Sequence, residues 1–147
     1  MAISISGILI TNLPLQFPGE LRDPGSGAVI DFWGKVRGTE DGRQLEGITY
    51  EAHRVMAEYQ MHFLAKKATL NFSLTALLLL HRVGFVPVGE ASLFLRVASR
   101  HRAAAFAGSQ WLIEELKRKI PIWKRPVFRN ANPVQFAAKQ TKETASR

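Results

Sequence analysis

The stretch that most constrains this chain runs from Ser99 to Arg125, SRHRAAAFAGSQWLIEELKRKIPIWKR. Its apolar residues recur at near-helical spacing, which predicts one amphipathic helix with a buried stripe. We expect Ser99 to cap this helix. Pro121 should end it, because proline lacks the N–H that a helix needs and disfavours the helical conformation at the residue before it. The expected buried stripe consists of Ala105, Phe106, Ile113, Leu116 and Ile120.

Most of the positive charge lies in the same stretch. Its 27 residues hold seven Lys or Arg and two Glu, a net +5 out of +8 for the whole chain. This excess implies an anionic partner, which charge alone leaves open among nucleic acid, an acidic protein surface and a phosphorylated metabolite. The 147 residues contain no cysteine, which excludes disulfides, thiolate metal sites and cysteine nucleophiles. Because neither a membrane-spanning run nor a signal peptide is recognisable, a cytoplasmic location is expected.

Alternating segments, a β-branched and aromatic segment and a continuous apolar run together predict a mixed α/β sandwich, with strands in one layer and two main helices in the other. A helix is expected within residues 51–67 and should pack one face on the sheet. The apolar residues Val55, Tyr59 and Phe63 recur there at four-residue steps, with Met56 and Leu64 beside them. One domain should cover residues 1–126, followed by a partly flexible tail over 127–147. Strands are expected over 3–10, 27–37, 45–52, 74–83 and 91–98, a loop over 12–27, an exposed mobile connection over 38–44, and a turn over 85–90.

Lys117 and Lys124 flank Pro121 and form the first candidate site. A cation in the last helical turn is already stabilised by the helix dipole, so Lys117 has a purely structural explanation. The chain after Pro121 could instead fold Lys124 back toward Lys117. Two ammonium groups held close would each favour the neutral amine of the other, which suits nucleophilic or general-base work. Trp123 would either fix this short basic arm or be a core residue.

Two further basic pairs are candidates for anion binding. Lys35 and Arg37 share one face of a strand end, and the plain alternative is a solvated strand end. His101 and Arg102 lie in the first turn of the long helix, where cations are unfavourable unless an anion joins them. His101 and Lys117 are sixteen residues apart, or about 24 Å along a straight helix. They therefore belong either to unrelated sites or to composite pockets of a symmetric homodimer.

Four segments together resemble the large, catalytic subunit of molybdopterin synthase. They are GAVIDFWGKVRG, LEGITYEAH, HRVGFVPVGE and SRHRAAAF…LIEELKRKIPIWKR, in that family's order, and they cover about residues 27 to 125. The resemblance implies an α/β hammerhead-type fold with a small extra β subdomain. It also implies a central homodimer flanked by two small ubiquitin-like sulfur-carrier subunits, making a heterotetramer without a bound cofactor or metal. The carrier's C-terminal Gly-Gly thiocarboxylate would deliver sulfur to cyclic pyranopterin monophosphate, giving the dithiolene of molybdopterin.

The resemblance also assigns roles to residues. Lys117 would be the main catalytic group, with Lys124 supporting it and binding substrate. His101 and Arg102 would reach the pocket across the dimer. The remaining substrate-binding positions would be Lys35, Val36, Arg37, Arg125 and Pro126.

The chain departs from the family pattern at two places. Pro126 stands where the family usually has an acidic residue directly after the basic arm, and residues 128–147 do not resemble the family's C-terminal stretch. These departures keep open a non-catalytic scaffold that binds the carrier. A pI near 10.3 keeps open a nucleic-acid-binding module, although no recognisable single-strand platform or zinc finger supports it.

Overall fold

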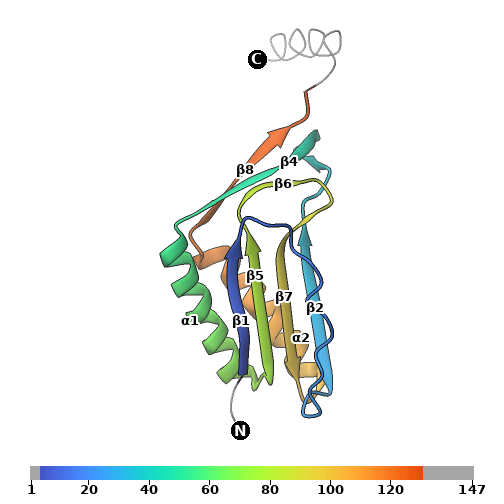
Figure 1. Ribbon diagram of the computed structural model, residues 1–147, viewed down its shortest axis with the longest axis vertical. Coiled ribbons are helices and arrows are strands. Elements are labelled where there is room, and N and C mark those ends of the chain that lie inside the picture. Colours follow the sequence, from blue (N-terminus) through green and yellow to red (C-terminus); the bar gives the residue numbers. More distant parts are fainter. Residues whose placement is uncertain (1–3, 131–147) are drawn as a thin grey trace.

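The large sheet carries the main core. In the computed structural model, which describes residues 4–130, β1 (Ser4–Thr11), β5 (Ala76–Arg82), β7 (Ala91–Ser99) and β2 (Ala28–Lys35) lie in the order β1-β5-β7-β2. β1 pairs with β5 in parallel, and the other two pairings are antiparallel. The helices α1 (Arg54–Phe72) and α2 (Arg102–Lys119) pack together and against this sheet (Figure 1). The mixed α/β sandwich and the strands expected for this sheet are confirmed.

A second, smaller sheet stands at one end of the large one (Figure 1). It contains β3 (Thr39–Glu40), β4 (Arg43–Ala52), β6 (Gly84–Pro87) and β8 (Ile122–Phe128), and both β6 and β8 pair with β4. Its own small core is made by Val36, Leu45, Ile48 and Val86. The extra β subdomain implied by the family resemblance is therefore present.

Three local expectations near this small sheet need correction. The connection expected over 38–44 folds as the β3–β4 hairpin, because Asp41 and Gly42 adopt the positive φ values that a two-residue hairpin turn requires. The turn expected over 85–90 is replaced in its first half by β6, which pairs with β4. The boundary expected between 126 and 127 falls inside β8.

Helix α1 buries a different face from the one expected. The sequence indicated Val55, Tyr59 and Phe63, yet these are 78%, 69% and 52% exposed, and Met56 is half exposed. α1 carries two apolar faces, and the one with smaller side chains lies against the sheet, where it permits close approach. Leu64 was the one member of the expected set placed correctly. The buried face consists of Ala57, Met61, Leu64, Ala65, Ala68 and Thr69.

Helix α2 starts later than expected and ends as expected. Ser99 is the last residue of β7, and its hydroxyl donates to the His101 carbonyl, so it does not cap the helix; His101 occupies the N-cap position without a side-chain bond. Ala105 and Leu116 are buried and Ile113 and Ile120 are partly buried, but Phe106 is 62% exposed. Ile120 is extended directly before Pro121, which ends the helix.

Gly47 is a position where β4 tolerates no side chain. A Cβ there would overlap the Val86 carbonyl oxygen and lie within 2.8 Å of the Phe85 ring. We expect Gly47→Ala to lower the free energy of unfolding by about 1–3 kcal/mol, because β6 must move away from β4. Urea unfolding measures this. Gly38→Ala is the matched control, since its new methyl group would meet only Val88 at 3.8 Å; equal losses in both variants would contradict the expectation.

Candidate active site

A cavity of about 660 Å³ lies where the two sheets and the two helices meet. Its apolar wall includes Phe32, Ile113, Leu116, Ile120 and Ile122. Four basic residues line it as well, namely Lys35, Arg37, Lys117 and Lys124. Side chains more than 80 positions apart in the sequence therefore share one pocket, which combines apolar surface with concentrated positive charge.

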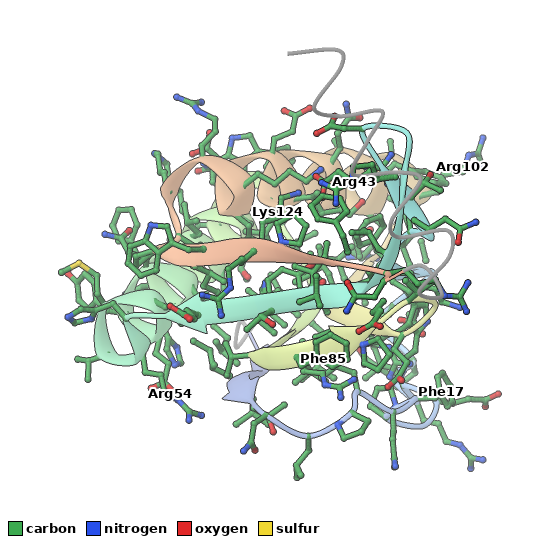
Figure 2. The ribbon with its side chains drawn as sticks, turned by 90° about the horizontal axis from the view of Figure 1, so that it is seen from above. Phe17, Arg43, Arg54, Phe85, Arg102 and Lys124 are labelled. Atoms are coloured by element: carbon green, nitrogen blue, oxygen red, sulfur yellow. The ribbon has the colours of Figure 1, made fainter. Side chains whose placement is uncertain are left out.

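The turn after Pro121 brings Lys124 back to Lys117. Ile120 leaves the helix in an extended conformation, and β8 then pairs antiparallel with β4, setting Lys124 opposite Tyr50, another pocket residue. Figure 2 shows Lys124 on β8 beside α2. The chain does fold back after Pro121, and Lys117 and Lys124 line the same pocket.

Strand periodicity separates Lys124 from its neighbours on the arm. Side chains alternate between the two faces of a strand, so Ile122 and Lys124 face the pocket while Trp123 and Arg125 face away from it. Trp123 is 61% exposed, so it is neither a core residue nor a buried anchor. Arg125 lies 3.7 Å from Glu51. Pro126 pairs with Ile48 and does not line the pocket, although it is two residues from Lys124.

Val36 lines the pocket, and both of its backbone polar groups are already hydrogen-bonded. It is 3% exposed, its N–H donates to the Glu90 carbonyl, and its own carbonyl accepts from Gly89. These two bonds tie the end of β2 to the turn before β7 and thereby hold Lys35 and Arg37, on either side of Val36, at the pocket.

His101 and Arg102 are far from this pocket within one chain. α2 runs from the far end of the large sheet, where these residues lie, to the small sheet, where Lys117 lies (Figure 1). Its 18 residues make it about 27 Å long. Both residues are exposed, and neither lines the cavity.

In the part of the chain that the structure describes, the basic residues of the pocket lack carboxylate partners, whereas neighbouring basic residues on α2 have one. Arg118 and Lys119, in the same turn as Lys117, pair with Glu115 at 3.2 and 3.0 Å. Within residues 4–130, none of the four basic pocket residues has a carboxylate within ion-pair distance. The charge of the pocket is therefore available to a ligand.

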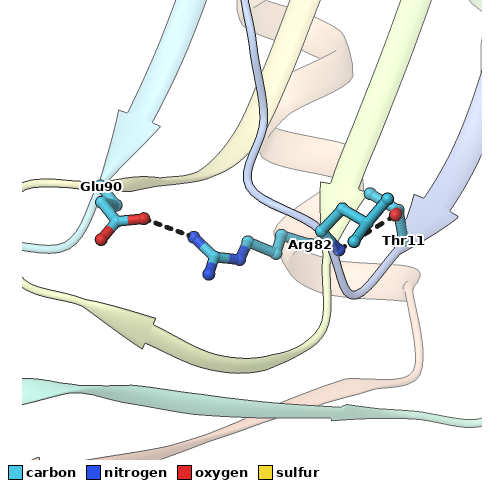
Figure 3. Close-up of polar contacts among 4 residues, drawn as sticks. Thr11, Arg82 and Glu90 are labelled. Carbon is cyan, nitrogen blue, oxygen red and sulfur yellow. Dashed lines mark hydrogen bonds and ion pairs between the residues drawn. The ribbon is translucent and has the colours of Figure 1, made fainter.

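Sequence reasoning missed His81, Tyr50 and Glu40, which also line the pocket. His81 is the last but one residue of β5, and its ring centroid lies 5.5 Å from that of Tyr50 in an edge-on arrangement. The adjacent Arg82 points elsewhere and pairs with Glu90 at 2.8 Å, while the Thr11 carbonyl accepts from Val83 (Figure 3). The sequence did contain a signal for His81, namely a polar residue near the end of an otherwise apolar strand.

The state of His81 should be visible in stability measurements. Burial lowers the pKa of His81 from its usual value of 6.5, although its hydrogen bond to the Arg82 carbonyl acts in the opposite direction. Below about pH 6.5 the unfolded chain therefore binds a proton at this residue that the folded chain lacks, and the free energy of unfolding falls as the pH decreases. We expect urea unfolding between about pH 7.5 and 5 to show a shallower decline for His81→Gln than for the unchanged protein. Parallel curves would contradict this.

Two further features bear on the class of protein. Neither described helix combines the length and apolarity needed to cross a bilayer. Within residues 4–130, no three His, Cys, Asp or Glu side chains gather as a metal site would require. The fold and the pocket define an α+β protein with a cationic, apolar-walled cavity suited to an anionic organic ligand.

Comparison with known proteins identifies the family. The chain belongs to the MoaE protein family, whose sequence model matches residues 11–119. It is 35% identical to the molybdopterin synthase catalytic subunit of Thermoplasma volcanium over 119 residues, covering 81% of this chain and 87% of that one. It spans 58% of a longer relative of the same name from rice.

Solved structures agree with this assignment. The crystal structure of molybdopterin synthase from Staphylococcus aureus matches with a TM-score of 0.77 and 27% identity, covering 83% of this chain and 91% of that one. A complex of subunits 1 and 2 of the molybdopterin-converting factor from Helicobacter pylori matches with a TM-score of 0.59 and 23% identity, over 74% of this chain and 75% of that one. The latter likeness concerns the fold alone.

Proposed function

We propose that the cavity binds cyclic pyranopterin monophosphate together with the C-terminal thiocarboxylate of a small sulfur-carrier protein. Membership in the MoaE family makes the chain a catalytic subunit of molybdopterin synthase, a sulfur-transferring enzyme. The observation that carries the proposal is the group of four basic residues, all without carboxylate partners in the described part of the chain, in a pocket with an apolar wall. The proposed product is the dithiolene of molybdopterin.

The charges fit two anionic reactants that must come together. A phosphate and a thiocarboxylate repel each other, and cations between them remove much of that repulsion. In this proposal Lys35 and Arg37 hold phosphate from the β2 side. Lys117 acts on the reacting centre from α2, and Lys124 supports it from β8 while also contacting substrate. Val36 serves as apolar wall.

The sulfur must come from outside the chain, because its sequence contains no cysteine. A carrier with a flexible Gly-Gly end would meet this need, since a narrow tail can enter a cavity that a folded domain cannot. The Helicobacter pylori structure is itself a complex of two different subunits. No resident cofactor or metal takes part in the proposed reaction.

We further propose that the functional unit contains two copies of this chain. His101 and Arg102 lie about one helix length from the pocket, which is too far for one small ligand. A twofold interface would place these residues of one copy at the pocket of the other, and would do so twice. With one carrier at each pocket the assembly would be a heterotetramer. Arg125 and Pro126 lie outside the proposed pocket.

A reconstitution experiment tests the function. The purified chain is mixed with thiocarboxylated carrier and cyclic pyranopterin monophosphate, and the dithiolene product is followed by its conversion to a fluorescent oxidised pterin. We expect product only when all three components are present. Carrier binding without product would indicate a non-catalytic scaffold, and would overturn the proposal.

A further inference from the structure

His81 is held in one orientation at the pocket. It lies next to the end of β5, and its Nδ1 is 2.9 Å from the carbonyl oxygen of Arg82, the last residue of that strand. The Tyr50 ring, from β4, meets it nearly at right angles, with an interplanar angle of 71°. Contacts with two different strands therefore fix the ring, and both His81 and Tyr50 line the cavity.

This arrangement determines which ring nitrogen is free. A carbonyl oxygen can only accept, so Nδ1 of His81 carries the proton and donates it to Arg82. In a neutral ring Nε2 is then a bare acceptor. Among the residues that the structure describes, Nε2 has no hydrogen-bond partner. It is also not among the side-chain atoms that are both fully enclosed and unpaired, so it remains accessible. Nε2 is therefore open to the pocket that His81 lines.

Burial favours the neutral form of the ring. It lowers the pKa of His81, although the hydrogen bond to the Arg82 carbonyl acts in the opposite direction. Arg82 turns away to Glu90 and does not compete for the ring. Glu40 is the one carboxylate among the lining residues, and its Oε2 is enclosed. The pocket thus offers basic side chains to bind an anion. At a different place in its wall it offers a hydrogen-bond acceptor, Nε2 of His81, beside the ring of Tyr50.

We propose that His81 Nε2 accepts a hydrogen bond from a ring N–H of the ligand whose phosphate lies among the basic residues. This inference rests on the proposed function and adds to it the means by which the heterocycle is recognised. A reduced pterin carries N–H groups on its ring, whereas a simple phosphate ester offers none. In this proposal His81 is a substrate-binding residue that selects the heterocycle, while Lys35 and Arg37 hold the phosphate.

Two variants separate the two nitrogens of the ring. His81→Asn keeps a donor near the position of Nδ1 and removes the acceptor at Nε2, whereas His81→Gln reaches the position of Nε2 and restores an acceptor. Affinity is measured by calorimetry or NMR for two probes, cyclic pyranopterin monophosphate and a small cyclic phosphodiester without a heterocycle. We expect His81→Asn to weaken binding of the pterin about tenfold and leave the phosphodiester unchanged, and His81→Gln to recover most of the loss.

The ratio of the two affinities makes the result decisive. Partial unfolding lowers binding of both probes equally, so it does not alter the ratio. An unchanged ratio in His81→Asn, or a loss for both probes, would overturn the inference, because the ring would then act on the fold or on the lysines. The binding measurement needs no carrier and no turnover. Failure of the proposed sulfur transfer is a separate outcome: product is missing in the reconstitution assay, while His81→Asn still weakens binding of the pterin relative to the phosphodiester.

Discussion

Lys117→Ala is expected to slow dithiolene formation by about 10²–10³-fold in the reconstituted assay. Lys117 belongs to α2 and lines the cavity, and no carboxylate in the described chain lies within ion-pair distance of it. Removing its amine takes away both a proton-transfer or nucleophilic group and a cation beside two anionic reactants, and effects of this size follow from losing one such group. Single-turnover measurements at saturating substrate report the chemical step.

The same turn of α2 provides the matched control. Lys119→Ala removes an equal charge two residues away, but Lys119 pairs with Glu115 at 3.0 Å and does not line the cavity. We expect its rate to stay within about twofold of the unchanged protein, because the amine removed does not line the cavity. Lys117→Arg keeps the charge without the amine, so recovery of activity in this variant would assign Lys117 an electrostatic role. Full activity of Lys117→Ala would contradict the assignment.

Mixing two variants that are each defective in the assay is expected to give about one quarter of the activity of the unchanged protein, because one quarter of all pockets would be intact. One variant is Lys117→Ala and the other is Arg102→Ala, and they are unfolded and refolded together so that subunits combine at random. Half of the dimers then contain one of each, and one of their two pockets combines an intact Lys117 with an intact Arg102 from the other copy. The gain arises because α2 separates these residues by about 22 Å within a chain.

The same experiment excludes a site confined to one chain. If both residues served a pocket of their own chain, every pocket in the mixture would carry one defect and activity would stay at the level of the single variants. Sedimentation of the unchanged protein as a monomer at assay concentration would contradict the composite site as well. Each variant refolded alone provides the baseline.

Much of the fold follows from local patterns. Pro121 ends α2, and the strands of the large sheet follow from alternation, from β-branched and aromatic content or from a continuous apolar run, because all of these signals depend on neighbouring residues only. The exposed face of α1 could not be predicted from periodicity. Val55, Tyr59 and Phe63 form as regular an apolar stripe as Ala57, Met61 and Leu64, and the choice is made by how closely the sheet can approach. The β3–β4 hairpin was predictable from Asp41-Gly42 but was interpreted as a mobile connection.

The site divides in the same way. Lys117 and Lys124 were found because the break at Pro121 is local, and Lys35 and Arg37 because they share a strand end. Arg125 was assigned to the same basic arm, yet strand pairing with β4 sends it to the opposite face toward Glu51. His81 reaches the pocket only through the assembly of β5 with β4 and α2. Its position therefore requires tertiary structure.

The placement of Lys117 and Lys124 on either side of Pro121 has a consequence for assembly. Seven positions separate the two lysines, so the conformational entropy lost in bringing them together is small. Joining them to Lys35 and Arg37 closes a loop of about 80 residues and needs both sheets in place. During synthesis or after partial denaturation, the two lysines can therefore approach each other early, whereas the full group of four pocket cations is completed last and lost first.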